Sequence, residues 1–190
     1  MSITTRLVAC AAVLGTALAV WGASDAAAAN YYNIVNSQTG RALEATADDR
    51  VKLAAPNPGN LLQQWKSING VNSGPLFVAA LDNRLLGCLR SDSDGSNLVA
   101  DLKLGLCDGS STDARKRWTQ LWGNLTANPS VPGYELVNGQ SAERIGEEFC
   151  LFTCAAVPRP TLYAAALVAS DPGAFGGSVK WDFRFVTSAP

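Results

Sequence analysis

From residue 30 onward, the hydrophobic positions form short apolar runs that are separated by turn signals. The runs end at glycine-containing pairs such as Thr39-Gly40, Asn69-Gly70, Asp94-Gly95 and Asn138-Gly139. Short apolar runs bounded in this way predict β-strands joined by tight turns. Long amphipathic helices are not evident in the pattern. The pattern therefore predicts an all-β protein.

The predicted strands recur along the chain. Residues 32–36 (Tyr-Asn-Ile-Val-Asn) recur as residues 134–138 (Tyr-Glu-Leu-Val-Asn), and residues 76–80 are the weaker middle counterpart. Residues 51–56 match residues 102–107 in the same way. Such self-similarity is typical of a chain built from small structural repeats.

Two further signals mark each repeat. A leucine follows a small residue or a cysteine in the segments 42–44, 88–90 and 150–152. A tryptophan then closes each repeat, and these three are Trp65, Trp118 and Trp181. Units this small share one core, so we expect the tryptophans to be core residues. Three four-stranded units around a pseudo-threefold axis predict a β-trefoil, with repeats at about 30–72, 73–126 and 127–190.

The first 29 residues have the features of a secretory signal peptide. Arg6 precedes an apolar run from Leu7 to Trp21, and small residues then lead to Ala29. The run is shorter than the ~20 residues that cross a bilayer as a helix. We therefore expect residues 30–190 to form one domain that is secreted to the extracellular space, with no membrane contact after cleavage.

Charge and composition exclude several functions. The formal net charge is −1, so the chain has no electrostatic attraction to nucleic acid. The chain has no histidine, which rules out Ser-His-Asp and Cys-His catalysis. The carboxylates form no recognisable catalytic pair. We expect a binding protein that is not an enzyme and that needs no cofactor.

Four cysteines remain after the predicted signal peptide, namely Cys88, Cys107, Cys150 and Cys154. An even number in an exported protein indicates disulfides, and four cysteines allow three pairings. A four-thiolate zinc site usually uses two close pairs of cysteines, whereas only Cys150 and Cys154 are close here. We therefore expect no metal.

The stretch Gln63-Gln64-Trp65 resembles the Gln-x-Trp mark of the ricin-type β-trefoil lectins, and residues 37–44 resemble that family's Ser-Gly-x-Cys-Leu-Asp. The resemblance covers the whole predicted mature chain, but only the first unit keeps the glutamine. It implies carbohydrate binding, and it implies a disulfide within a repeat, Cys88–Cys107. We expect the other pair to be Cys150–Cys154, which needs a turn through residues 151–153.

The chain departs from the family at the positions that bind sugar. The family places an aspartate after Cys-Leu, and these positions hold Glu44, Arg90 and Phe152 here. Ala54 and Gly105 stand where the family has a stacking ring. No family galactose pocket is therefore intact.

Two groups of polar residues remain as candidates for carbohydrate binding. Glu44 and Gln63 are the remnant in the first unit, although Gln63 is more often a structural hydrogen-bonding residue. Arg90, Asp92 and Asn97 lie in or beside a polar loop of the second unit, although such a loop is more typical of a solvated hairpin turn. We rank a glycan first as the partner of this exported protein.

The alternative partner is another exported protein. Trefoils of other families inhibit proteases through a rigid exposed loop, and Pro158 and Pro160 flank Arg159 here. Prolines on both sides hold an arginine in extended form, which suits insertion into a protease cleft. The chain could also be a subunit of an exported complex. Mutation of Arg159 would affect only this alternative.

Overall fold

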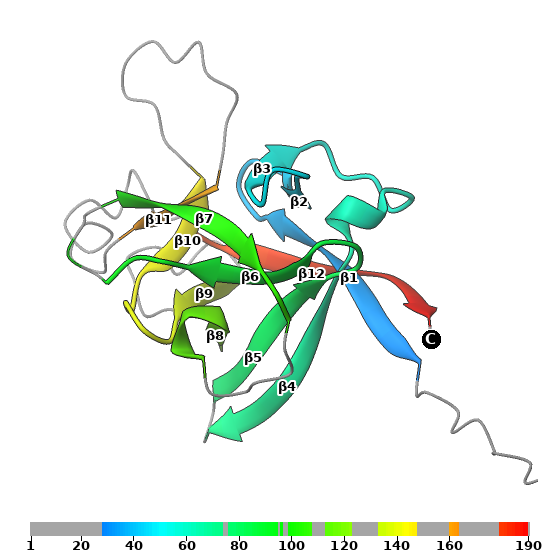
Figure 1. Cartoon of the computed structure of the whole chain (residues 1–190). Coiled ribbons are helices and arrows are strands. Elements are labelled where there is room, and N and C mark those ends of the chain that lie inside the picture. Colours follow the sequence, from blue (N-terminus) through cyan, green and yellow to red (C-terminus); the bar gives the residue numbers. More distant parts are fainter. Residues whose placement is uncertain are drawn as a thin grey trace, which may run out of the picture.

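The structure is a computed structural model, and it describes residues 28–73, 76–94, 96, 99–107, 113–122, 133–147, 160–163 and 179–189. Most of the predicted signal peptide lies outside these residues, as do Asn97, Phe152, Arg159 and the expected Cys150–Cys154 pair. The described elements are twelve strands and two short 3₁₀ helices (Figure 1). In chain order they are β1 (Ala29–Asn36), β2 (Ala42–Ala45), β3 (Val51–Ala54), η1 (Leu61–Gln63), β4 (Trp65–Ser73), β5 (Leu76–Asn83), β6 (Gly87–Ser91), β7 (Val99–Gly105), η2 (Ala114–Lys116), β8 (Arg117–Trp122), β9 (Tyr134–Asn138), β10 (Arg144–Glu147), β11 (Pro160–Tyr163) and β12 (Trp181–Ala189).

Six of the strands close into an antiparallel barrel. Around the ring, β1 pairs with β4, β4 with β5, β5 with β8, β8 with β9, β9 with β12, and β12 with β1. A closed ring leaves no unpaired sheet edge in the barrel. Each repeat contributes its first and last strand to this ring, so no repeat can form the barrel alone.

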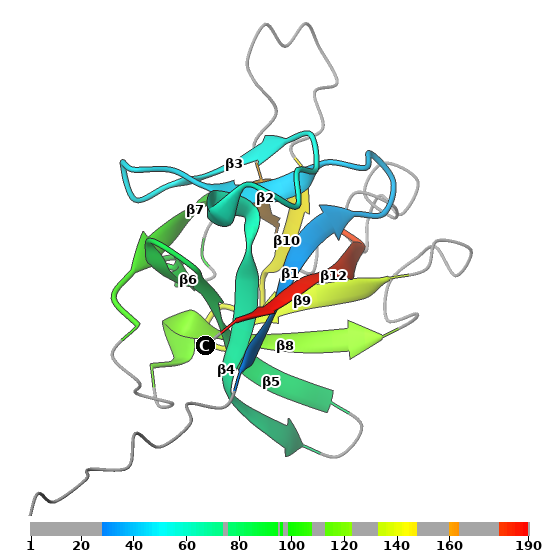
Figure 2. The ribbon, with the colours of Figure 1, turned by 90° about the vertical axis from the view of Figure 1, so that its right-hand side faces the viewer.

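The other six strands form three hairpins that cover one end of the barrel. These are β2–β3, β6–β7 and β10–β11, and each continues from a barrel strand that ends in asparagine. Figure 2 shows β2 and β3 above the barrel, whereas β4 and β5 extend to its other end. The barrel therefore has one covered end and one open end.

The three repeats are equivalent in strand register. Trp65 pairs with Asn83, Trp118 with Asn138, and Trp181 with Asn36. Each tryptophan also donates its indole hydrogen to a backbone carbonyl in its own repeat, and the acceptors are Leu43, Leu89 and Ile145 at 3.0, 3.0 and 2.8 Å. A six-stranded barrel with three equivalent hairpins is a β-trefoil, so the prediction of the fold is confirmed.

This register corrects two segments of the sequence alignment. Asn83 is the counterpart of Asn36 and Asn138, so the middle repeat uses residues 79–83 and not 76–80. Ile145 is the counterpart of Leu43, so the third repeat uses residues 144–146 and not 150–152. Small buried residues in β5 and the absence of a cysteine in β10 concealed both matches in the sequence.

The core is built by alternation along the strands. All three tryptophans are buried, as expected. They pack with aliphatic side chains from the barrel and the hairpins, among them Ile34, Leu43, Leu81, Leu89, Leu136 and Ile145. A β-strand places alternate side chains on opposite faces, so one face of each strand supplies this core. No helix among the described residues is long and apolar enough to cross a membrane.

Candidate functional site

In the first repeat, Glu44 and Gln63 hydrogen-bond to each other. Glu44 lies on β2 opposite Lys52 of β3, and its Oε2 accepts from Gln63 Nε2 at 2.7 Å and from Asn60 Nδ2 at 2.9 Å. Its Oε1 lies 2.8 Å from Lys52 Nζ. Burial alone would raise the pKa of Glu44, but the bonds from Lys52, Gln63 and Asn60 outweigh it and lower that pKa.

Gln63 is also held by the backbone of the preceding loop. Its Nε2 donates to Ala55 O at 3.0 Å, and its Oε1 accepts from Asn57 N at 2.7 Å. Glu44 and Gln63 are 8 % and 1 % exposed. The sequence analysis grouped Glu44 with Gln63, and the two side chains do contact each other. Their polar atoms, however, are used to hold the loop before η1. Their role as sugar ligands stays a prediction.

In the second repeat, Arg90 and Asp92 belong to an ion-pair cluster on the surface. Asp92 Oδ2 lies 3.0 Å from an Arg90 guanidinium nitrogen and 3.2 Å from Lys103 Nζ. Burial opposes the charge on Asp92, but Lys103 and Arg90 lower its pKa overall. Gly105 leaves the space that Arg90 fills, because a Cβ there would lie 2.8 Å from Arg90 Cδ. Arg90 therefore fills the space beside Gly105, the position where the resemblance to the lectins led us to look for a stacking ring.

In the third repeat, the position that follows Ile145 is Gly146 on β10. A glycine has neither an acceptor side chain nor a ring, so Gly146 offers no side-chain contact to a sugar. The sequence placed Phe152 at this position, and Phe152 lies outside the described residues.

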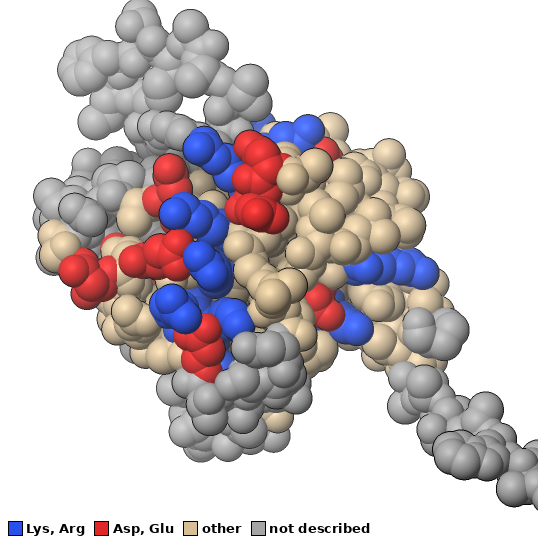
Figure 3. Space-filling view, in the orientation of Figure 1, with Lys and Arg blue, Asp and Glu red and all other residues tan. Residues whose placement is uncertain are grey.

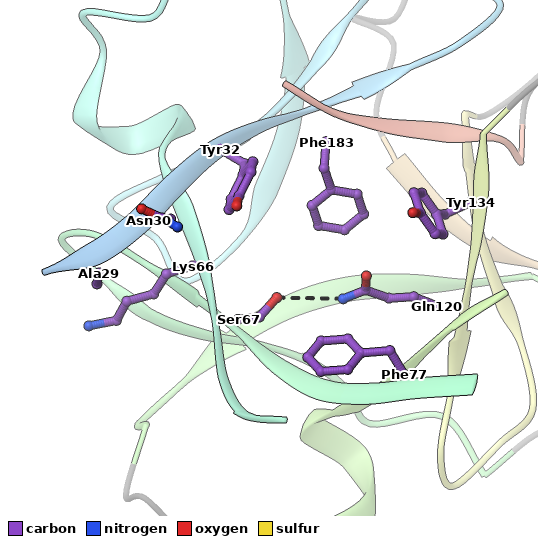
Figure 4. A pocket seen from close by; sticks show the side chains of 9 residues that line it. All are labelled: Ala29, Asn30, Tyr32, Lys66, Ser67, Phe77, Gln120, Tyr134 and Phe183. Carbon is purple, nitrogen blue, oxygen red and sulfur yellow. Dashed lines mark hydrogen bonds between the residues drawn. The ribbon is translucent and has the colours of Figure 1, made fainter. Parts of the chain in front are cut away.

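The open end of the barrel holds a pocket of about 550 Å³, and we call it the barrel-end pocket. All six barrel strands contribute lining residues, so the pocket lies around the pseudo-threefold axis. Four aromatic residues and two of the three uncharged polar residues that line it face a common space in Figure 4. They are Tyr32, Phe77, Tyr134 and Phe183, with Ser67 and Gln120.

The pocket exists because one layer of the barrel is filled unequally. Ser67, Gln120 and Phe183 each lie two residues after the tryptophan of their repeat, so they are equivalent positions. Only the third repeat places a ring there. Tyr32, Ala79 and Tyr134 are likewise equivalent, because each pairs in register with a tryptophan, and the second repeat has only alanine. The missing side-chain volume leaves the space open.

The aromatic rings stand as walls and do not stack on each other. Phe183 meets Tyr32 at 75° and Tyr134 at 88°, with ring centroids 6.2 and 5.7 Å apart. Edge-to-face contacts of this kind are favourable and hold the rings in fixed orientations. The rings are half-buried, so each keeps apolar surface for a ligand.

The polar side of the pocket is only weakly bonded within the protein. Gln120 Nε2 lies 3.5 Å from Ser67 Oγ, which is long for a hydrogen bond (Figure 4). Lys66 lines the pocket near Ala29 and Asn30, but its ammonium lies 3.4 Å from Asp82 Oδ2 and 5.7 Å from the centroid of Tyr31. The amide and the hydroxyl can therefore exchange their mutual bond for bonds to a ligand.

Sequence reasoning missed this pocket. The sequence repeats place Tyr32 and Tyr134 on strands. Because an inward-facing aromatic residue in a small barrel usually belongs to the core, the repeats did not suggest a binding site. The signal that could have revealed the pocket was the second position after each tryptophan. Serine and glutamine stand there in two repeats, where a filled barrel needs apolar side chains.

The Cys88–Cys107 disulfide is present, and its Cα atoms are 5.1 Å apart, so this prediction is confirmed. Asp82 Oδ1 lies 3.0 Å from Cys107 Sγ, and burial raises the pKa of Asp82 against the opposing effect of Lys66. Asp82 and the two cysteines bring potential metal-ligand atoms within 4.8 Å of one another. Both sulfurs are bonded to each other, however, so neither is a thiolate that could bind a metal.

Charged side chains of both signs are mixed on the face seen in Figure 3. Several form pairs at the surface, including Arg115 with Asp113 and Lys103 with Asp92. Mixed charges at short range cancel, so this face presents no extended field of one sign.

No family model matches the sequence, and a comparison with curated proteins finds no match. Solved structures do resemble the fold. A designed threefold-symmetric protein, ThreeFoil, has a TM-score of 0.56 at 17 % identity, over 83 % of this chain and 98 % of its own. The BEL β-trefoil has a TM-score of 0.54 at 15 % identity, over 83 % and 93 %.

An exo-β-1,3-galactanase from Clostridium thermocellum has a TM-score of 0.56 at 16 % identity. The match covers 83 % of this chain but only 30 % of the galactanase. At these identities, the likeness establishes the β-trefoil fold and nothing beyond it.

Proposed function

We propose that this chain is an exported carbohydrate-binding protein without enzymatic activity, related to the ricin-type lectins. The observation that carries the proposal is the barrel-end pocket, where aromatic rings stand beside an amide and a hydroxyl. A pyranose ring has an apolar face that packs on an aromatic ring, and hydroxyls that need donors and acceptors. Phe183 and the tyrosines supply the first requirement, and Gln120 and Ser67 supply the second.

The volume of the pocket suits this class of ligand. Small-molecule sites usually measure roughly 300–1,000 Å³ and combine apolar walls with a few polar groups. The barrel-end pocket has about 550 Å³ and that combination of groups. The described residues that line it include no carboxylate, and glycoside hydrolysis usually needs two. We therefore propose binding without turnover.

Fold-level comparisons give weaker support. The galactanase acts on a glycan by its name, and part of it has the fold of this chain. Because a fold alone does not specify a function, the proposal rests on the pocket. The protease-inhibitor alternative depends on Arg159 and gains no support from the described residues.

The test is a glycan array probed with the purified protein and five variants. Phe183→Ala removes a wall of the pocket, and Leu106→Ala is its control, because Leu106 is 85 % exposed and does not line the pocket. Gln120→Ala removes the amide that lines the pocket. Its control is Gln140→Ala, which makes the same substitution in an exposed turn.

We expect binding to at least one class of glycan, weakened about tenfold by Phe183→Ala and by Gln120→Ala, and unchanged in the controls. Glu44→Ala, tested on the same array, distinguishes the first repeat from the pocket. Binding lost only in Glu44→Ala would move the site to that repeat. Absence of binding to every glycan would refute the proposed function.

A further inference from the structure

We infer that the barrel-end pocket accepts the uncharged terminal unit of a glycan, inserted end-on, and that it rejects a terminal unit that carries a carboxylate. This inference rests on the proposed function and specifies its ligand.

The pocket is closed at its inner end. Ile34, Leu81 and Leu136 lie two residues further along their strands than Tyr32, Ala79 and Tyr134. These three aliphatic side chains are completely buried and belong to the core. Hairpins cover the barrel beyond them. A glycan chain therefore cannot pass through the barrel, and only its end can enter.

The interior of the pocket is electrically neutral. Lys66 is the only charged side chain among the described residues that line it, and the expected cleavage after Ala29 would add the ammonium of Asn30 on the same side of the pocket as Lys66 (Figure 4). The Lys66 side chain points away from Phe183 and Tyr134 in Figure 4, and its ammonium is 3.4 Å from the Asp82 carboxylate. A sugar carboxylate between Phe183 and Gln120 would lose water without gaining a cationic partner there, which is unfavourable. A neutral hydroxylated ring does not incur this cost.

The unequal layer also sets the direction in which a ring binds. Phe183 stands on one side of the axis, and Ser67 and Gln120 stand at the two equivalent positions. A ligand therefore meets an apolar wall on one side and hydrogen-bonding groups on the other. A pyranose has this same division between one of its faces and its edge hydroxyls.

The experiment is isothermal titration calorimetry of the purified protein with matched pairs of methyl glycosides. One pair is methyl galactoside and methyl galacturonoside, and the other is methyl glucoside and methyl glucuronoside. We expect the neutral member of a pair to bind at least about tenfold more tightly than its uronic acid. Linear oligosaccharides of the sugar that binds more tightly should bind with nearly the same affinity whether they have two rings or more.

A gain of function makes the test specific to the pocket. Gln120→Lys places a cation beside Ser67, so it should improve the binding of the uronic acid about tenfold. Gln140→Lys makes the same change of net charge in an exposed turn and should not. The melting temperature of each variant verifies that it is folded.

The outcomes separate this inference from the proposed function. Equal binding of both members of a pair, or affinity that keeps rising with the number of rings, would overturn the inference and leave glycan binding intact. Improved binding of the uronic acid in Gln140→Lys would also overturn it. No binding of any glycoside or oligosaccharide would overturn both.

Discussion

Glu44 shows how a polar residue at a sugar-binding position can become structural. Its carboxylate receives bonds from Gln63, Asn60 and Lys52, which come from the 3₁₀ helix η1, the loop before it and the facing strand β3. The side chain is only 10 % exposed, so water competes little for these bonds. Glu44 therefore joins the β2–β3 hairpin to the segment that leads into Trp65.

We predict that Glu44→Gln lowers the free energy of unfolding by about 1–3 kcal/mol at pH 7, because bonds to a charged acceptor are lost. The pKa of Glu44 is lowered in the fold from the ordinary 4.5. Its stabilising contribution is therefore complete above that value and is lost as the pH falls through the lower folded pKa. Urea unfolding at pH 7 and pH 3 should show a large difference from wild type at pH 7 and a small one at pH 3. An equal difference at both pH values would contradict the assignment.

At the residue scale, the sequence predicted the structural role of single residues within a repeat better than it predicted contacts between residues far apart in the chain. Gln63 as a structural hydrogen-bonding residue and Cys88 with Cys107 as a disulfide follow from the resemblance to a known repeat. The ion pair between Lys180 and Glu135 could not be predicted from that resemblance. Its Nζ and Oε1 atoms are 2.9 Å apart, and both side chains are fully buried. These residues are 45 positions apart, and only closure of β9 against β12 brings them together.

At the scale of elements, the β6–β7 hairpin depends on a covalent link. Cys88 lies near the start of β6, and Cys107 lies just after the end of β7, 19 positions later in the chain. Gly87 precedes Cys88 with φ of 114°, and a Cβ there would lie 2.6 Å from Gly105 O. Only glycine fits this close approach of two backbones. The hairpin end is therefore held by both the disulfide and the backbone contact.

We predict that the double variant Cys88→Ala/Cys107→Ala loses about 3 kcal/mol of stability, since the link restricts a 19-residue loop in the unfolded chain. Thermal unfolding measured by circular dichroism tests this. Wild-type protein treated with reductant should approach the double variant, if the Cys88–Cys107 bond is the one that matters. An unchanged melting temperature in the double variant would mean that the hairpin is held by its packing alone.

Strands were predictable from the sequence, but the two 3₁₀ helices were not. A three-residue helix has no hydrophobic period, and its signal is a single capping residue. Asn60 Oδ1 accepts from Leu62 N at 3.0 Å, and Asp113 Oδ1 accepts from Arg115 N at 3.1 Å. Asn60 and Asp113 are also common in turns, so their sequence could not distinguish a cap from a loop.

At the scale of the whole molecule, the barrel is complete only when the ends of the chain meet. β12 pairs with β1 over most of its length and with β9 at Trp181. Three repeats with tryptophans were enough to predict this closed architecture. The barrel-end pocket was not predictable, because it depends on which side chains share one layer after closure.

We predict that removal of residues 181–190 abolishes cooperative folding. The truncated chain would leave one edge of β1 and one edge of β9 unpaired and would open the core at the position of Trp181. Heat unfolding followed by far-ultraviolet circular dichroism should show no sigmoidal transition. Removal of residues 188–190 alone, which takes only the last two residues of β12, should preserve the transition. A cooperative transition in the longer truncation would show that two repeats together with β9, β10 and β11 suffice.

The position of the barrel-end pocket on the pseudo-threefold axis has a consequence for valency. A site within a repeat can occur three times in a trefoil, whereas a site on the axis occurs once. A single copy of this chain would hold one glycan end and could not cross-link two. It would cap exposed glycan ends on a surface without agglutinating the particles that carry them.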